Sequence, residues 1–151
     1  MKGIKYIDGS NVFFTSDTHF NHENIIKFCN RPFSSIDEMN DFIISEWNKK
    51  VPKNGIVYHL GDFGFGTTSK LIRLRNLLNG EIHLIVGNHD RKQLKDKIFA
   101  NCFESVSQQL YIYVENQAIY LNHCPFLCYD GVYRKNKTWQ KYEKNFVFDF
   151  S

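Results

Sequence analysis

Three short apolar runs, separated by segments with helical periodicity, most constrain how this chain can fold. The runs cover residues 12–15, 56–60 and 82–86, and their β-branched and aromatic side chains are typical of buried strands. The intervening segments predict helices over residues 36–51 and 69–78, where apolar side chains recur on one face. Strands that alternate with helices favour an α/β fold with parallel strand pairing.

Local signals predict where the helices begin and end. Ser35 and Glu38 form a capping box at the start of the first long helix. Pro52 follows the end of that helix, because the residue before a proline disfavours α geometry. Shorter helices are expected near residues 24–28 and over residues 92–99.

The last third of the chain is predicted to form strands without intervening helices. The runs over residues 103–107, 110–114 and 118–121, with a turn at Asn116, indicate hairpins and therefore a mixed or second sheet. A length of 151 residues favours a single domain over residues 1–151.

The composition excludes several classes of protein. With 42% hydrophobic and 16% aromatic residues, the chain has too much apolar mass for a disordered protein. No apolar run reaches the roughly 18 residues of a membrane span, and the first residues lack the apolar core of a signal peptide. We therefore expect a cytoplasmic protein with reduced cysteines and no membrane partner. A net charge of +3, from scattered basic residues, makes nucleic acid an unlikely partner.

Polar side chains follow the predicted strands at the points where those strands end. In an open α/β sheet, ligands bind outside the carboxyl ends of the strands, so these side chains should meet at one crevice. They are Asp17, His19, Asp62, Asn88, His89 and His123.

Carboxylate oxygens and imidazole nitrogens are a ligand set that suits Mn, Fe or Zn. In an extended chain the side chains of Asp17 and His19 face the same way. Asp62 follows a glycine that lets the backbone turn sharply, which leaves its carboxylate free to bridge two ions. His89 is a natural general acid or anion-stabilising donor, with Asp90 close enough to orient it.

Taken in order, these motifs resemble those of the calcineurin-like metallophosphoesterases, in particular small bacterial and phage-type members. The matching motifs are Asp17-x-His19, Gly61-Asp62, Gly-Asn-His-Asp at residues 87–90, and His123. The resemblance extends over residues 12–139. It implies a four-layer α/β/β/α sandwich of two mixed sheets flanked by helices.

The resemblance also implies a dinuclear metal site. It assigns one divalent ion to Asp17, His19 and Asp62. It assigns the second ion to Asp62, Asn88 and His123, so that Asp62 bridges the two ions. Mn²⁺ is the first expectation for both ions, with Fe, Zn or Ni as alternatives. Two such ions lower the pKa of a bridging water and clamp phosphate oxygens.

The implied reaction is hydrolysis of a phosphate ester by a metal-bound hydroxide, without a covalent enzyme intermediate. His89 stabilises or protonates the leaving oxygen, and Asp90 is the second expected catalytic residue. The substrate is expected to be a small phosphate ester or a nucleotide, either a monoester or a diester. A nuclease is disfavoured because it needs a basic groove.

One family motif has no counterpart here. Family members end with Gly-His-x-His, whose two histidines give one ligand to each ion, whereas His123 is the last histidine of this chain. We therefore expect a C-terminally incomplete domain without its last strands, as after a frameshift or early stop, and with weaker metal sites. The alternative function is a catalytically impaired pseudoenzyme or binding module that keeps the fold without turnover.

Three further histidines have competing interpretations. His22 either touches substrate or lies on the surface, and His59 either supports the metal ligands or fills a strand position. His83 alternates with apolar neighbours and is predicted to be structural. Cys124 and Cys128 lack the second pair of ligands that a zinc cluster needs.

Overall fold

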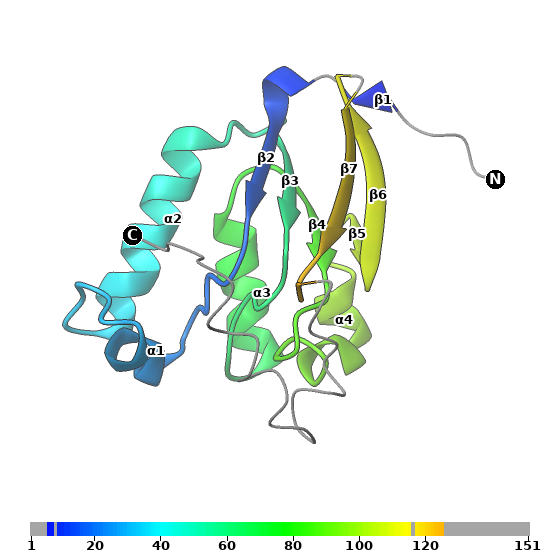
Figure 1. Ribbon diagram of the computed structural model, residues 1–151. Helices are drawn as coiled ribbons and strands as arrows, with labels where there is room; N and C mark the ends of the chain where they lie inside the picture. The colour runs from blue at the N-terminus through cyan, green and yellow to red at the C-terminus, as the bar shows by residue number, and fades with distance from the viewer. Residues whose placement is uncertain (1–5, 8, 116, 126–151) are drawn as a thin grey trace, which may run out of the picture.

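The computed structural model describes residues 6–7, 9–115 and 117–125. Its larger sheet has the strand order β2-β3-β4-β5, and every neighbouring pair is parallel (Figure 1). The four strands are β2 (Val12–Thr15), β3 (Ile56–His59), β4 (Glu81–Ile85) and β5 (Ser105–Ser107). The three predicted apolar runs are therefore confirmed as adjacent parallel strands.

A second, smaller sheet has the order β1-β6-β7 and is mixed. Its strands are β1 (Tyr6–Ile7), β6 (Gln109–Val114) and β7 (Gln117–Asn122). The predicted hairpin is confirmed, because β6 and β7 pair antiparallel, while β1 pairs parallel with β6. The prediction that the preceding run also forms a hairpin is wrong. The backbone N–H of Glu104 donates to the carbonyl of Ile82 at 2.8 Å, and β5, which follows, pairs parallel with β4 instead.

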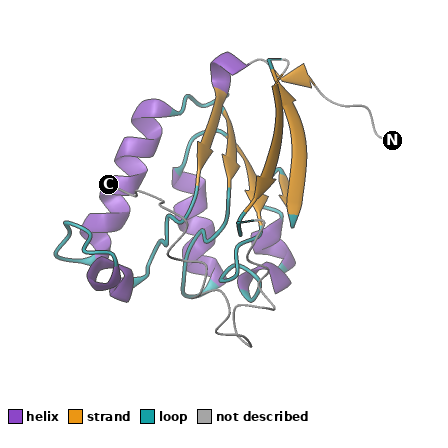
Figure 2. Ribbon diagram, in the orientation of Figure 1, coloured by secondary structure: helices purple, strands orange, loops and turns teal. Residues whose placement is uncertain are grey.

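The helices cover one face of the parallel sheet, and the smaller sheet covers the other (Figures 1 and 2). They are α1 (Glu23–Phe28), α2 (Ile36–Lys50), α3 (Thr68–Leu77) and α4 (Lys97–Ala100), with 3₁₀ turns η1 (Gly9–Asn11) and η2 (Gln93–Lys95). The mixed α/β fold is confirmed. The described residues form three layers. The predicted turn at residue 116, and the expectations of a fourth layer and of missing last strands, concern residues outside them. No described helix is long and apolar enough to cross a membrane.

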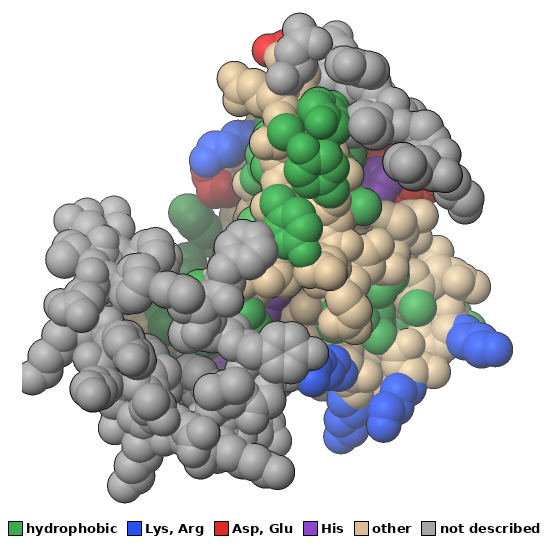
Figure 3. Space-filling model, turned by 45° about the vertical axis from the view of Figure 1, so that its right-hand side comes forward, with side chains coloured by type: hydrophobic (Ala, Val, Ile, Leu, Met, Phe, Trp, Pro, Cys, Tyr) green, Lys and Arg blue, Asp and Glu red, His purple; other side chains and the backbone are tan. Residues whose placement is uncertain are grey.

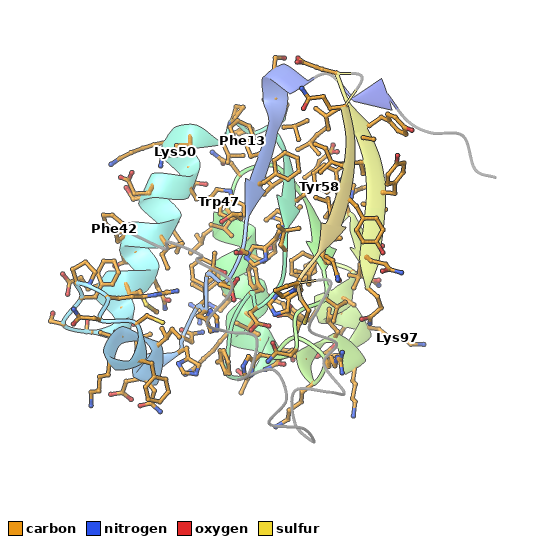
Figure 4. All side chains as sticks on the ribbon, viewed as in Figure 1. Phe13, Phe42, Trp47, Lys50, Tyr58 and Lys97 are labelled. Atoms are coloured by element: carbon orange, nitrogen blue, oxygen red, sulfur yellow. The ribbon has the colours of Figure 1, made fainter. Side chains whose placement is uncertain are left out.

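Alternation along the strands divides the apolar side chains between two cores. Val57 and Leu84 face the helices and pack in one cluster with Trp47 of α2, which points toward the sheet in Figure 4 while Lys50 points away. Tyr58 faces the opposite way and packs with Ile112 between the two sheets. The parallel sheet is thus buried on both faces, and its polar groups are left at its carboxyl edge.

The helix boundaries follow the predicted signals with one exception. Ser35 Oγ accepts a hydrogen bond from the Glu38 N–H at 3.2 Å, which confirms the N-terminal cap, and α2 ends just before Pro52. The helix predicted over residues 92–99 is wrong, because it is divided into η2 and α4. Asp96 lies between them with extended backbone, and its carboxylate caps the start of α4.

Candidate metal centre

The loops that follow β2 and β3 are joined by backbone hydrogen bonds. The Asp17 N–H donates to the Gly61 carbonyl at 2.9 Å, and the His19 N–H donates to the Asp62 carbonyl at 3.1 Å. Asp17, His19 and Asp62 all adopt left-handed backbone, with φ of 53°, 53° and 54°. The expectation that Asp17 and His19 lie in extended chain is therefore wrong. Three non-glycine residues in this region cost about 1–2 kcal/mol each and are typical of a functional site.

Two glycines let the loop after β3 come close to the residues that follow β4 and β7. Gly61 has φ of 101°, and a Cβ there would lie 2.6 Å from Gly87 Cα and 2.7 Å from His123 Nδ1. A Cβ on Gly87 would lie 2.5 Å from the backbone nitrogen of Asp62. Since real Cβ contacts of this length are essentially absent, both positions require glycine if Asp62 is to keep its place.

The carboxylate of Asp62 lies at the centre of the strand-end side chains. Asp62 is only 3% exposed. Oδ2 lies 3.7 Å from His19 Nε2, and Oδ1 lies 3.8 Å from His123 Nε2. Asp17, Asp62 and His123 each offer one ligand atom, and these three atoms lie within 4.8 Å of one another. One oxygen of Asp62 thus faces the imidazole of His19 and the other faces that of His123.

Backbone carbonyls accept hydrogen bonds from the buried His19 and from the partly buried His123. Nδ1 of His19 lies 2.9 Å from the Asp17 carbonyl, and Nδ1 of His123 lies 2.7 Å from the Leu60 carbonyl. A carbonyl can only accept, so both Nδ1 atoms carry a proton, and each Nε2 is the ring atom left to face Asp62 or a metal ion. This orientation by a backbone carbonyl is usual for histidines that bind metal.

His123 Nε2 also lies 3.0 Å from Asn88 Oδ1, which is another acceptor. We call the following residues, whose acceptor atoms converge on this point, the acceptor cluster: Asp17, His19, Asp62, Asn88 and His123. Facing acceptors repel one another unless a proton or a cation lies between them, and divalent cations are bound by this set of oxygen and nitrogen atoms. The cluster therefore fits a metal ion.

Asp90 is 2% exposed and holds the loops together. Oδ2 accepts hydrogen bonds from the N–H groups of Asp62 and Gly87, and Oδ1 accepts from that of Phe63, all at 2.9 Å. Burial raises the pKa of this carboxyl, against the opposing effect of the N–H donors. The expectation that Asp90 orients His89 is wrong, because both of its oxygens serve the backbone of neighbouring loops.

His89 lies beside the acceptor cluster with its side chain half exposed. Its Nε2 is 3.9 Å from Asp62 Oδ2, and its backbone N–H donates to Asp62 Oδ1 at 3.0 Å. Its ring centroid lies 5.0 Å from that of Phe65. The same aromatic ring packs against His19 at 5.6 Å and His22 at 4.0 Å. Phe65 therefore forms an apolar wall for the site, a role that nothing in its sequence context indicates.

His59 is hydrogen-bonded to the loops after β2 and β3. Among the described residues, it makes no hydrogen bond to the acceptor cluster. It is fully buried, and its Nδ1 accepts a hydrogen bond from the Gly61 N–H at 3.1 Å. Its Nε2 therefore carries the proton and donates to Thr18 Oγ1 at 3.0 Å, which donates in turn to the Phe63 carbonyl at 2.7 Å. Burial, with smaller contributions from His123 and His19, lowers the pKa of His59 to about 3, so this ring is neutral.

Arg31 also holds the loop after β2 in place, which the sequence pattern did not indicate. Its Nη2 donates to the Asp17 carbonyl at 2.9 Å, and Nη1 donates to the Thr18 carbonyl at 3.0 Å. The Asp17 carbonyl also accepts from His19 Nδ1, so the guanidinium and the imidazole meet on one oxygen. Arg31 lies in the loop before α2, fourteen residues from Asp17, and no motif links the two positions.

The remaining histidines have local roles. His22 caps α1 by accepting a hydrogen bond from the Ile25 N–H on Nδ1 at 2.8 Å, and burial together with His19 lowers its pKa. His83 lies 2.7 Å from Ser105 Oγ and stacks on Tyr58, which confirms its structural assignment. Cys128 lies outside the described residues.

Comparison with known proteins identifies the family of this chain. Residues 10–150 match the calcineurin-like phosphoesterases. An uncharacterised protein of Methanocaldococcus jannaschii, MJ1445, is 52% identical over 82 residues, covering 53% of this chain and 47% of that protein. The Gene 66 protein of Mycobacterium phage D29 is 41% identical over 86 residues, covering 54% of this chain and 41% of that protein. The matches thus span about half the length of these relatives or less.

A solved structure shares the fold. The crystal structure of the protein of unknown function AQ665 from Aquifex aeolicus superposes with a TM-score of 0.64 and is 29% identical in sequence. The similarity covers 89% of this chain and 73% of that one.

Proposed function

Because this chain belongs to the calcineurin-like phosphoesterase family, we propose that it hydrolyses a phosphate ester at the acceptor cluster, with two divalent metal ions as cofactors. The observation that carries the proposal is the pair of bare Nε2 atoms, on His19 and His123, that flank the carboxylate of Asp62. Burying the Asp62 carboxylate costs free energy that its hydrogen bond with the His89 N–H offsets only in part, and a bound cation would offset more of it.

The residues divide into two sides of Asp62. His19 lies on the side of Oδ2, and His123, with Asn88 beside it, lies on the side of Oδ1. The ligand atom of Asp17 lies within 4.8 Å of those of Asp62 and His123, and we propose that Asp17 serves the ion next to His19. We propose that each side holds one ion, with Asp62 between them and Mn²⁺ as the first choice of metal. Bound ions of this kind lower the pKa of water and neutralise phosphate oxygens.

His89 is the proposed catalytic residue. Its exposed imidazole stands at the edge of the acceptor cluster, where it can touch the substrate, and its backbone N–H holds Asp62 in place. A protonated imidazole at this point would stabilise the phosphate charge and give its proton to the leaving oxygen. Asp90 is a positioning residue, because it fixes the backbone on both sides of Asp62.

The test is hydrolysis of aryl phosphate monoesters and diesters with and without Mn²⁺, with His89→Ala as the comparison. We expect Mn²⁺-dependent turnover that the variant largely loses. Equal inertness of the two proteins at millimolar Mn²⁺ would reject the enzyme and favour the alternative, a binding module that keeps the fold without turnover. Comparing the two ester types also decides between monoesterase and diesterase activity.

A further inference from the structure

A cleft of about 730 Å³ opens next to the acceptor cluster. One side is the loop of residues 65–67, and the other is the segment of residues 88–95, which begins with Asn88 and His89. This volume lies within the roughly 300–1,000 Å³ of small-molecule sites. It is several times what one phosphate group fills, so the cleft has room for more of a substrate than its reacting phosphate.

Among the described residues that line the cleft, the Lys and Arg side chains have no acidic counterpart. Arg91, Lys92 and Lys95 line it, and no Asp or Glu is among its described lining residues. Both lysines are exposed. Figure 3 shows Lys and Arg side chains gathered at the lower end of the molecule, with no acidic side chain visible between them. The carboxyl ends of the parallel strands point toward the same end in Figure 1.

The two acids that flank these cations in sequence are both engaged, and Asp90 accepts three backbone N–H groups. Asp96 follows Lys95 directly, but its Oδ2 accepts from Thr68 Oγ1 at 2.6 Å and its Oδ1 accepts from the Ile98 N–H at 2.9 Å. These hydrogen bonds hold its carboxylate at the start of α4, where it serves as the N-cap of that helix.

The segment that carries the cations is tied to the metal centre. The Leu94 N–H donates to the Asp90 carbonyl at 3.0 Å, and the Asp90 side chain binds the backbone of Asp62. The cations and the acceptor cluster are therefore held in a fixed relation, as a site with two anion-binding parts requires.

We propose that this basic cleft binds a second phosphate of the substrate, so that the preferred substrates carry two or more linked phosphates, as nucleoside diphosphates and short polyphosphates do. The inference rests on the proposed function, which places the reacting phosphate at the acceptor cluster. Water adds to the terminal phosphorus, the bond from that phosphorus to the bridging oxygen breaks, and the leaving phosphate takes a proton on that oxygen. A simple monoester has no second phosphate to contact Lys92 and Lys95.

Binding to the metal-free protein tests the cleft by itself. Tripolyphosphate is titrated calorimetrically in EDTA into the wild type, Lys92→Gln, Lys95→Gln and the double variant. Lys53→Gln is the matched control, since this exposed lysine lies in the loop before β3, at the opposite end of the sheet. Each cleft variant should weaken binding about 3- to 10-fold and the double variant about 10- to 50-fold. The control should bind as the wild type does.

Two results would overturn the inference. Cleft variants that bind tripolyphosphate as tightly as Lys53→Gln would show that these cations hold no phosphate. A single-stranded oligonucleotide bound at least tenfold more tightly than tripolyphosphate would make the ligand a nucleic acid.

Activity separates this inference from the proposed function. With Mn²⁺ present, the ratio of kcat/KM for ADP to that for phenyl phosphate should exceed one and should fall in the double variant. If the protein hydrolyses phenyl phosphate but the ratio is the same in both proteins, the cleft inference fails and the proposed function stands. If neither ADP nor phenyl phosphate is hydrolysed, the proposed function fails, and the calorimetric result still decides whether the cleft binds linked phosphates.

Discussion

The buried carboxylate of Asp90 accepts a hydrogen bond from the backbone N–H of Asp62 at 2.9 Å, although the two residues are 28 positions apart. The same side chain also binds the backbone at Gly87 and Phe63. Two loops that carry predicted metal ligands are thereby fixed by one carboxylate, and the position of Asp62 depends on it.

Replacing this carboxylate should therefore loosen the whole centre. In Asp90→Asn, one acceptor oxygen becomes an NH₂ group that faces a backbone donor, so the free energy of unfolding should fall by about 2–4 kcal/mol. Asp96→Asn is the matched control, because asparagine is as good an N-cap as aspartate and should cost less than about 1 kcal/mol. Denaturant unfolding in EDTA measures both. Similar losses in the two variants would contradict the role given to Asp90.

Metal binding should stabilise the protein through the acceptor cluster. Mn²⁺ binds the folded chain, so its addition after EDTA treatment should raise Tm. Asp62→Asn removes the charge that faces both predicted positions, and we expect it to abolish most of this rise. His83→Gln changes a histidine outside the cluster and should retain the rise. Differential scanning calorimetry gives the answer, and an unchanged rise in Asp62→Asn would place the metal elsewhere.

The contribution of His89 should depend on the leaving group. Loss of a general acid lowers rates about 10²- to 10⁴-fold, and an alkyl leaving group needs the proton more than a nitrophenyl group does. We therefore expect His89→Gln to lower kcat more for an alkyl phosphate than for a nitrophenyl phosphate, with the Mn²⁺ affinity retained. Steady-state kinetics and a calorimetric metal titration measure the two quantities. An equal loss with both esters would leave His89 only an electrostatic role.

His59 should make the folded state sensitive to acid. Its pKa is about 3 in the folded protein against an ordinary value of 6.5, so between these values the unfolded chain binds a proton that the folded chain does not. The titration of His59 contributes no pH dependence well above pH 6.5, and it lowers the free energy of unfolding as the pH falls toward 3. From pH 7 to pH 5 this loss is roughly 2 kcal/mol.

His59→Gln keeps a donor for Thr18 and cannot be protonated. The variant should therefore lose less stability than the wild type between pH 7 and pH 5, whatever its stability at pH 7. Guanidinium unfolding at the two pH values measures the difference. Equal losses in both proteins would mean that His59 is not held neutral by burial.

Arg31 should affect metal binding without touching the metal. Its guanidinium donates to two adjacent carbonyls at once, and a lysine ammonium lacks that planar fork. Arg31→Lys should weaken Mn²⁺ binding about 3- to 10-fold, because the Asp17 carbonyl also positions the ring of His19. Arg73→Lys, on the exposed side of α3, should leave the affinity unchanged. Calorimetric titration with Mn²⁺ distinguishes the two variants.

Much of the fold was predictable because its signals are local. The strands at residues 12–15, 56–59 and 81–85 follow from runs of apolar side chains, and the start of α2 follows from the cap at Ser35. The pairing of β5 was not predictable, because a short strand after a helix fits a hairpin or a parallel sheet equally well. The break at Asp96 was missed because a capping residue within a helical pattern also fits an exposed helix position.

The sequence by itself determined which chemical groups stand at the strand ends, since strand periodicity and residue type depend only on near neighbours. The tertiary structure alone decided how those groups are used. The left-handed backbone at Asp17, the neutral state of His59, the contact of Arg31 and the three hydrogen bonds of Asp90 all depend on partners that packing brings close. A buried hydrogen-bonding group must find a partner, and only the folded chain determines which one it meets.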